Sequence, residues 1–133
     1  MKKIFIIFCL IISSVVSAQK IIKYNSVNYF FIERMNGKEG FSKPEKVNVE
    51  ILLDINNKII TVKQQIYQII ELKPTESGSN FTMSNYRCLD ENKLECNISI
   101  HKFTKPNNNG VLQQLFISYK KIEHVYDMNL IEN

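Results

Sequence analysis

Short apolar segments separated by polar turns run along most of the chain, and residues 47–54 show the pattern most clearly. There, apolar side chains at every second position alternate with Asn48 and Glu50. Successive side chains of an extended chain point to opposite faces, so this period of two predicts a half-buried strand. The turn-forming residues 54–58 lead into a second apolar run at 59–63, which predicts a β-hairpin.

The same pattern predicts further strands along the chain. These are expected at residues 21–24, 27–34, 65–72, 80–88, 94–103, 111–119 and 124–130. Segments 35–46, 73–79 and 104–110 contain Gly, Pro and Asn, and are predicted as loops. About eight short strands without a convincing helix indicate an all-β fold. We expect a small antiparallel barrel or barrel-like sheet with up-and-down strand order, and a β-sandwich is the alternative.

Residues 27–34 are apolar on both faces of the predicted strand. Tyr29 and Phe31 point to one side, and Phe30 and Ile32 to the other. This favours a strand covered on both sides, although one of the two faces would also suit a pocket or a partner surface.

The N-terminus has the three parts of a secretory signal peptide: Lys2 and Lys3, an apolar run, and the small-residue stretch Val16-Ser17-Ala18. It resembles bacterial signal peptides that end in Ser-Ala-Gln. Its apolar stretch is shorter than the roughly 20 residues that a membrane-spanning helix needs. We therefore expect cleavage after Ala18, with residues 19–133 forming a single exported β domain, periplasmic or secreted, that has no stable membrane span.

Export changes what the charge implies about partners. The chain carries 17 Lys and Arg against 13 Asp and Glu, for a net charge of +4, and cleavage removes Lys2 and Lys3, which leaves +2. A nearly neutral exported domain is a poor match for nucleic acid, even though Tyr119-Lys120-Lys121 interleaves aromatic and basic side chains.

Export also removes Cys9, so that the mature domain keeps Cys88 and Cys96. A turn centred on Asn92 places these two cysteines opposite each other. The same register gives one apolar face, with Tyr86 and Ile98, and one polar face. An even number of cysteines in an exported chain favours a disulfide. The Cys-x-x-Cys spacing of redox pairs is absent, and we therefore predict a structural disulfide between Cys88 and Cys96.

The sequence contains no arrangement typical of catalysis. His101 and His124 lack metal-ligand spacing, and there is no Gly-x-Ser-x-Gly elbow or glycine-rich phosphate loop. The sequence therefore predicts a non-enzymatic protein with no metal and no cofactor.

Two hypotheses about function follow from the aromatic side chains. The first is a binding module that takes a small apolar molecule or a peptide into the barrel mouth or onto an open face. Its binding residues would be among Phe30, Tyr67, Tyr86 and Tyr126. The second is a structural or protein-interaction module of the cell envelope that meets another envelope protein and has no small-molecule ligand. A completely filled barrel interior would argue against the first hypothesis.

Overall fold

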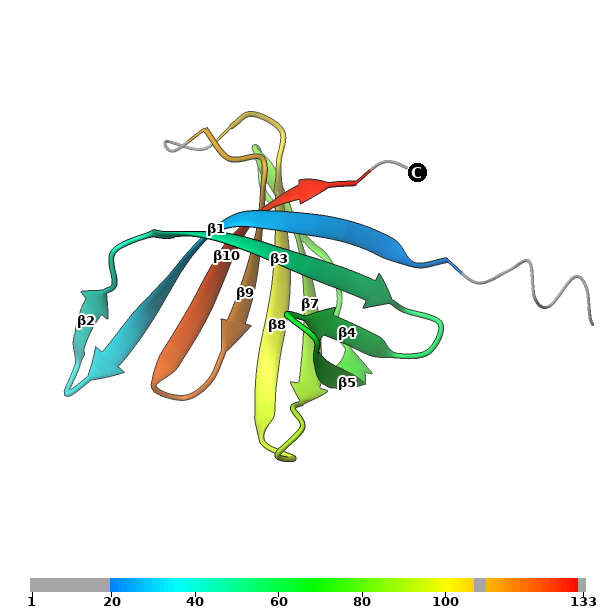
Figure 1. Cartoon of the computed structure of the whole chain (residues 1–133), viewed down its shortest axis with the longest axis horizontal. Helices are drawn as coiled ribbons and strands as arrows, with labels where there is room; N and C mark the ends of the chain where they lie inside the picture. Colours follow the sequence, from blue (N-terminus) through cyan, green and yellow to red (C-terminus); the bar gives the residue numbers. More distant parts are fainter. Residues whose placement is uncertain (1–19, 107–109, 132–133) are drawn as a thin grey trace, which may run out of the picture.

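The computed structural model describes residues 20–106 and 110–131, and the regular elements in this part of the chain are all β-strands (Figure 1). Eight strands close into an antiparallel barrel, and two short strands extend it. The predicted all-β barrel is therefore confirmed. The strands are β1 (Ile22–Met35), β2 (Lys38–Phe41), β3 (Glu45–Asp54), β4 (Ile59–Val62), β5 (Gln65–Leu72), β6 (Glu76–Ser77), β7 (Phe81–Leu89), β8 (Glu95–Phe103), β9 (Gln113–Ser118) and β10 (Ile122–Leu130).

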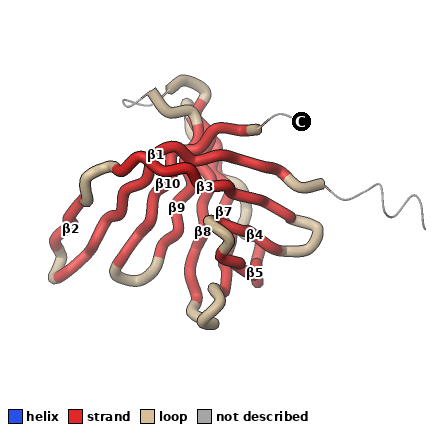
Figure 2. Tube along the Cα trace, viewed as in Figure 1, coloured by secondary structure: helices blue, strands red, loops and turns tan. Residues whose placement is uncertain are grey.

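The barrel strands follow each other in space in chain order. The sequence of neighbours is β1-β3-β4-β5-β7-β8-β9-β10, and β10 pairs with β1 to close the ring. The short strand β2 forms a hairpin with the C-terminal end of β1, and β6 pairs with the start of β7. Figure 2 shows the loops gathered at the ends of the strands, as the up-and-down order requires.

Every second side chain of the barrel strands points inward and forms an apolar core. In β3, Val49, Ile51 and Leu53 are buried, whereas Glu50 is exposed, which confirms the alternation in the sequence. The core residues from the other strands include Tyr24, Ile60, Val62, Tyr67, Ile69, Cys88, Cys96, Ile98, Ile100, Leu115, Ile117 and Met128.

The two segments predicted at 21–24 and 27–34 form one continuous strand, β1. The pairing register shifts between Ser26 and Asn28 on both sides of β1, and Val27 is exposed at that point. The hydroxyl of Ser26 donates a hydrogen bond to the carbonyl of Asn28 at 3.1 Å. A bulge of this kind adds one residue and bends the strand without ending it.

The segment predicted as a loop at 35–46 contains β2. Asn36 and Gly37 have φ values of 53° and 77°, and Met35 pairs with Lys38. Two successive positive φ values define the type I′ hairpin turn for which Asn-Gly is the strongest sequence signal. The resulting β1–β2 hairpin projects to the left of the barrel in Figure 1. The predicted loop at 73–79 likewise contains the short strand β6.

The cysteine pair requires a correction. Cys88 and Cys96 face each other in the predicted register and are both buried, but they are free thiols. The N–H of Asp90 donates to the carbonyl of Leu94 at 3.0 Å, so Cys88 and Cys96, two residues further along, form a hydrogen-bonded pair. Side chains of such pairs stand farther apart than those of the alternate pairs, and a disulfide needs Cβ atoms only about 3.5–4.5 Å apart.

The predicted signal peptide, residues 1–18, lies outside the described residues. Within residues 20–106 and 110–131 there is no helix with the length and apolar character needed to cross a membrane.

Candidate functional site at one end of the barrel

Three hairpin turns meet at one end of the barrel, here called the open end. They join β4 to β5 at Lys63–Gln64, β7 to β8 at 90–94, and β9 to β10 at 119–121. The last two turns lie at the lower edge of Figure 1. Lys63 and Gln64 have φ values of 52° and 67°, so the β4–β5 turn is also of type I′ and keeps its strands close together.

Asp90 fixes two of these turns relative to each other. One of its carboxylate oxygens accepts the N–H groups of Asn92 and Leu94, each at 2.9 Å, which folds the β7–β8 turn. The other oxygen accepts the hydroxyl of Tyr119 at 2.7 Å, and Tyr119 begins the β9–β10 turn. This local Asx geometry explains why an acidic residue occupies the first position of the turn.

The interior of the barrel is hollow at the open end. One hollow of about 240 Å³ reaches down to Val49 and Ile117, and a second of about 380 Å³ lies between the β7–β8 and β9–β10 turns. Both are lined by Gln65, Tyr67 and His124. Deeper in the barrel, away from the open end, the apolar core fills the interior. The two hollows together are here called the cup, which is open at one end and is not a channel.

Aromatic side chains from β1 and β10 form one wall of this cup. Pairing places Tyr29 opposite Tyr126, and their ring centroids are 4.9 Å apart. The ring of Tyr29 also stacks on that of His124, and its hydroxyl lies 2.7 Å from Nδ1 of His124. These contacts join the first and last strands of the barrel across its closing seam.

Two other tyrosines also line the cup: Tyr67 from β5, across the barrel from β10, and Tyr119 from the β9–β10 turn, whose ring lies edge-on to that of His124. The hydroxyl of Tyr67 donates to Oε1 of Gln65 at 3.2 Å, and that of Tyr119 donates to Asp90. The hydrogens of both hydroxyls are therefore used within the protein, and their oxygens keep the capacity to accept further hydrogen bonds.

The protonation states of this site follow from burial and hydrogen bonding. Burial raises the pKa of Tyr67 and of Tyr126 to about 12, and it lowers the pKa of His124 below its ordinary value. The hydrogen bond from Tyr119 lowers the pKa of Asp90. Near neutral pH the phenols and His124 are uncharged, whereas Asp90 carries a negative charge.

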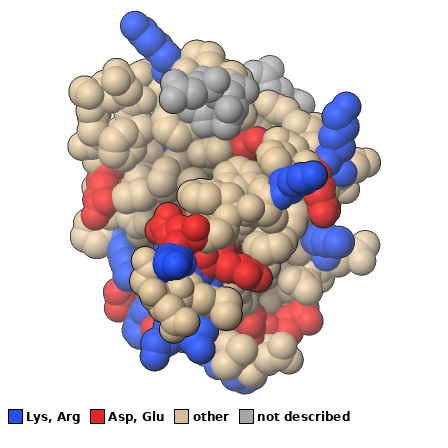
Figure 3. All heavy atoms as spheres, turned by 90° about the vertical axis from the view of Figure 1, so that its left-hand side faces the viewer, with Lys and Arg blue, Asp and Glu red and all other residues tan. Residues whose placement is uncertain are grey.

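Carboxylates outnumber cations in the lining of the cup. Glu45, Asp90 and Glu91 line it together with Lys63. Figure 3 shows one face of the whole molecule, where acidic and basic side chains are interspersed. The excess of carboxylates in the cup therefore contrasts with the positive net charge of the chain, which is +4.

The structure brings together two of the four residues that the sequence analysis proposed for ligand binding. Tyr67 and Tyr126 both line the smaller hollow. Tyr86 packs against the apolar core and does not line the cup. It lies close to Tyr24, whose pKa is raised mainly by burial and in smaller part by Tyr86. Phe30 lies on the outer face of the barrel, beside Asn28 and Asp127.

Sequence reasoning missed Tyr29, Tyr119, Asp90 and Glu45 as members of the same site. Tyr29 comes from the middle of β1, Glu45 from the start of β3, and Asp90 and Tyr119 from two turns, so that only the barrel arrangement of the strands brings them together. One usable signal was the spacing of His124 and Tyr126, because residues two apart share a face of a strand.

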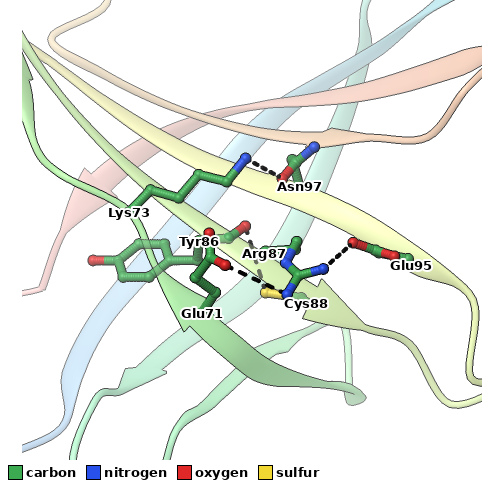
Figure 4. A network of polar contacts seen from close by, with 7 residues as sticks. All are labelled: Glu71, Lys73, Tyr86, Arg87, Cys88, Glu95 and Asn97. Carbon is green, nitrogen blue, oxygen red and sulfur yellow. Dashed lines mark hydrogen bonds and ion pairs between the residues drawn. The ribbon is translucent and has the colours of Figure 1, made fainter.

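A second polar network lies on the outside of β5, β7 and β8, and Figure 4 shows Glu71 and Glu95 directed at Arg87, with Lys73 and Asn97 in contact beside them. The guanidinium of Arg87 lies 3.4 Å from Glu71 and 2.9 Å from Glu95, and Lys73 donates to Asn97 at 3.2 Å. These groups are largely solvent-exposed, and ion pairs of this kind contribute little to stability. Within the described residues no group of three or more His, Cys, Asp and Glu side chains is placed to hold a metal ion.

No family model matches the chain, and neither do any of the curated proteins or solved structures compared with it. The candidate site therefore rests on its own geometry and chemistry.

Proposed function

We propose that this protein is a non-enzymatic binding protein that takes a small ligand into the open end of its barrel. The observation that carries the proposal is the hollow lined by Tyr29, Tyr67 and Tyr126 above a filled core. Barrels of eight strands are wide enough either to fill with side chains or to hold one small ligand. This barrel combines the two: side chains fill most of its interior, and the cup occupies the open end.

The lining favours an amphipathic ligand over the wholly apolar one that the sequence suggested. Binding sites in proteins are mostly apolar with a few polar groups that fix the orientation of the ligand. Here tyrosine rings supply the apolar surface, and Gln65, His124 and Asp90 supply polar atoms beside it. A small molecule with an aromatic or aliphatic body and one polar end matches this arrangement.

The setting that we propose for this activity is outside the cytoplasm. The signal-like N-terminus supports export to the periplasm or the exterior. A ligand in either compartment would reach the cup directly from solvent, because Glu45, Lys63 and Gln65 at its rim are exposed.

A pair of adjacent substitutions tests the proposal. Val47 points into the smaller hollow, whereas its neighbour Asn48 is exposed on the outer face. We expect Val47→Trp to fill the hollow and abolish binding, and Asn48→Trp to leave binding unchanged. Gln65→Trp, at a more exposed position of the same lining, serves as a second blocking variant.

Binding is measured by NMR titration with three phenyl compounds that differ in charge: 2-phenylethylamine, 2-phenylethanol and phenylacetate. The proposal predicts that at least one of them shifts the resonances of Tyr67, His124 and Tyr126, and that both blocking variants prevent these shifts. If no compound shifts these resonances, or if the blocking variants bind as well as Asn48→Trp, the proposal is wrong. The alternative of an envelope interaction module without a ligand is then favoured.

A further inference from the structure

We infer that the ligand of the open end is a small organic cation, a protonated or quaternary amine. This inference rests on the proposed function and adds the chemical class of the ligand. It is carried by three features of the cup: the hydrogen-bonding state of two of its hydroxyls, the placement of its carboxylates, and the grouping of its aromatic rings.

Two hydroxyls of the cup, those of Tyr67 and Tyr119, act toward a ligand as acceptors. Tyr67 and Tyr119 donate their hydrogens to Gln65 and Asp90. What these phenols offer to a ligand is therefore oxygen lone pairs. An ammonium group is the complementary partner, because it has three donors and no acceptor.

The carboxylate of Glu45 lies at the rim of the smaller hollow, and its strand position is paired with that of Tyr29. Among the described residues no Lys, Arg or His comes within ion-pair distance of Glu45. Its charge is thus available to a ligand. Asp90 and Glu91 add two more carboxylates to the lining, in a chain whose overall charge is positive.

The rings of Tyr29 and Tyr126, with centroids 4.9 Å apart, and the buried ring of Tyr67 line the hollow beside Glu45. The negative face of an aromatic ring attracts a cation, and groups of such rings are a general way to recognise quaternary ammonium ions. An ammonium that entered the hollow would lie beside these rings and near the carboxylate of Glu45.

Lys63 lines the smaller hollow together with Glu45 and carries the opposite charge. It lies at an exposed turn position, where a long side chain keeps its ammonium group in water. Lys63 and Glu45 should therefore act in opposite directions on a charged ligand. A merely polar pocket would not show this pair of opposite effects.

The test compares the affinities of 2-phenylethylamine, 2-phenylethanol and phenylacetate for the full chain by titration calorimetry. We expect the amine to bind about tenfold more tightly than the alcohol, and phenylacetate to bind most weakly. Glu45→Gln should weaken the amine about fivefold and leave the alcohol unchanged, and Lys63→Gln should strengthen the amine about twofold. Glu50→Gln, an exposed carboxylate on the outer face of the same strand, is the matched control and should change neither affinity.

The possible outcomes separate this inference from the proposed function. If the alcohol or phenylacetate binds as tightly as the amine, or if Glu45→Gln and Glu50→Gln act alike, the inference is wrong while the binding site stands. If none of the three compounds binds, both the proposed function and the inference are wrong.

Discussion

The hydroxyl of Tyr29 lies 2.7 Å from Nδ1 of His124, although the two residues are 95 positions apart in the chain. Tyr29 belongs to β1 and His124 to β10, so this contact crosses the seam at which the barrel closes. The same two rings form the wall of the cup proposed to bind the ligand. The contact therefore links the closing seam of the barrel, which β1 and β10 form by strand pairing, to the wall of the site.

Tyr29→Phe removes the hydroxyl but keeps the ring. We expect it to lower the free energy of unfolding by about 1 kcal/mol, the usual net contribution of a hydrogen bond in a partly buried setting. A double-mutant cycle with His124→Phe, measured by urea denaturation, isolates the pair and should give a coupling energy of about 1 kcal/mol. Strict additivity of the two substitutions would show that the contact contributes nothing.

Acidification should destabilise the protein through its two histidines. Burial lowers the pKa of both His101 and His124 below the ordinary value of 6.5. The unfolded chain then binds protons more readily than the folded one. The contribution of the two histidines to the free energy of unfolding is therefore fully present well above pH 6.5 and is lost as the pH falls below this value. The lowered pKa of Asp90 acts in a separate window, below about 3.8.

NMR titration of the imidazole resonances should place both histidine pKa values below 6.5. Urea unfolding at pH 7.5, 6.5 and 5.5 should show decreasing stability, and the variant His101→Asn/His124→Asn should show a smaller decrease. Equal pH dependence in the wild type and the double variant would mean that other groups are responsible.

The thiols of Cys88 and Cys96 should be present but unreactive in the folded protein. Burial raises the pKa of Cys88 to about 12 and that of Cys96 to about 11, and only the thiolate is a good nucleophile. We expect slow alkylation at pH 8 in the folded state and rapid alkylation of both in urea without reductant. Peptide mapping reads each residue separately, and a peptide pair linked through Cys88 and Cys96 would restore the disulfide prediction.

A buried polar network stabilises the outer side of the closing seam. Asp127 in β10 accepts hydrogen bonds from the side-chain amides of Gln114 at 2.8 Å and Asn28 at 3.1 Å. Asp127→Ala would leave both donors without this partner, and we expect a loss of about 2–3 kcal/mol in the free energy of unfolding. Glu50→Ala, at an exposed position, should cost less than about 0.5 kcal/mol. Similar losses for the two variants in urea denaturation would refute the role of the network.

The strand pattern could be predicted from the sequence because inward and outward side chains alternate so regularly. Val49, Ile51 and Leu53 mark the inner face of β3 without any knowledge of the other strands. The pairing of β7 with β8 was also predictable, since the turn at Asn92 and the apolar face around Cys88 require the same register. Local sequence was sufficient wherever both partners of a pairing are close in the chain.

The site was only partly predictable, because its parts are distant in the chain. Tyr67 and Tyr126 were expected to bind a ligand, but nothing local distinguishes them from Tyr86, which packs against the core. The free state of Cys88 and Cys96 depends on which cross-strand pairs are hydrogen-bonded. The turn at Asp90 decides which of the alternating cross-strand pairs are hydrogen-bonded, and the spacing of the cysteines does not reveal it.

The location of a bound molecule is the most direct test of ligand binding at the open end. Intermolecular nuclear Overhauser effects are measured between 2-phenylethylamine at saturating concentration and the assigned rings of the protein. We expect contacts to Tyr29, Tyr67 and Tyr126 at the open end. Contacts confined to the outer face, for example to the neighbouring rings of His101 and Phe116, or no contacts at all, would contradict the proposed site.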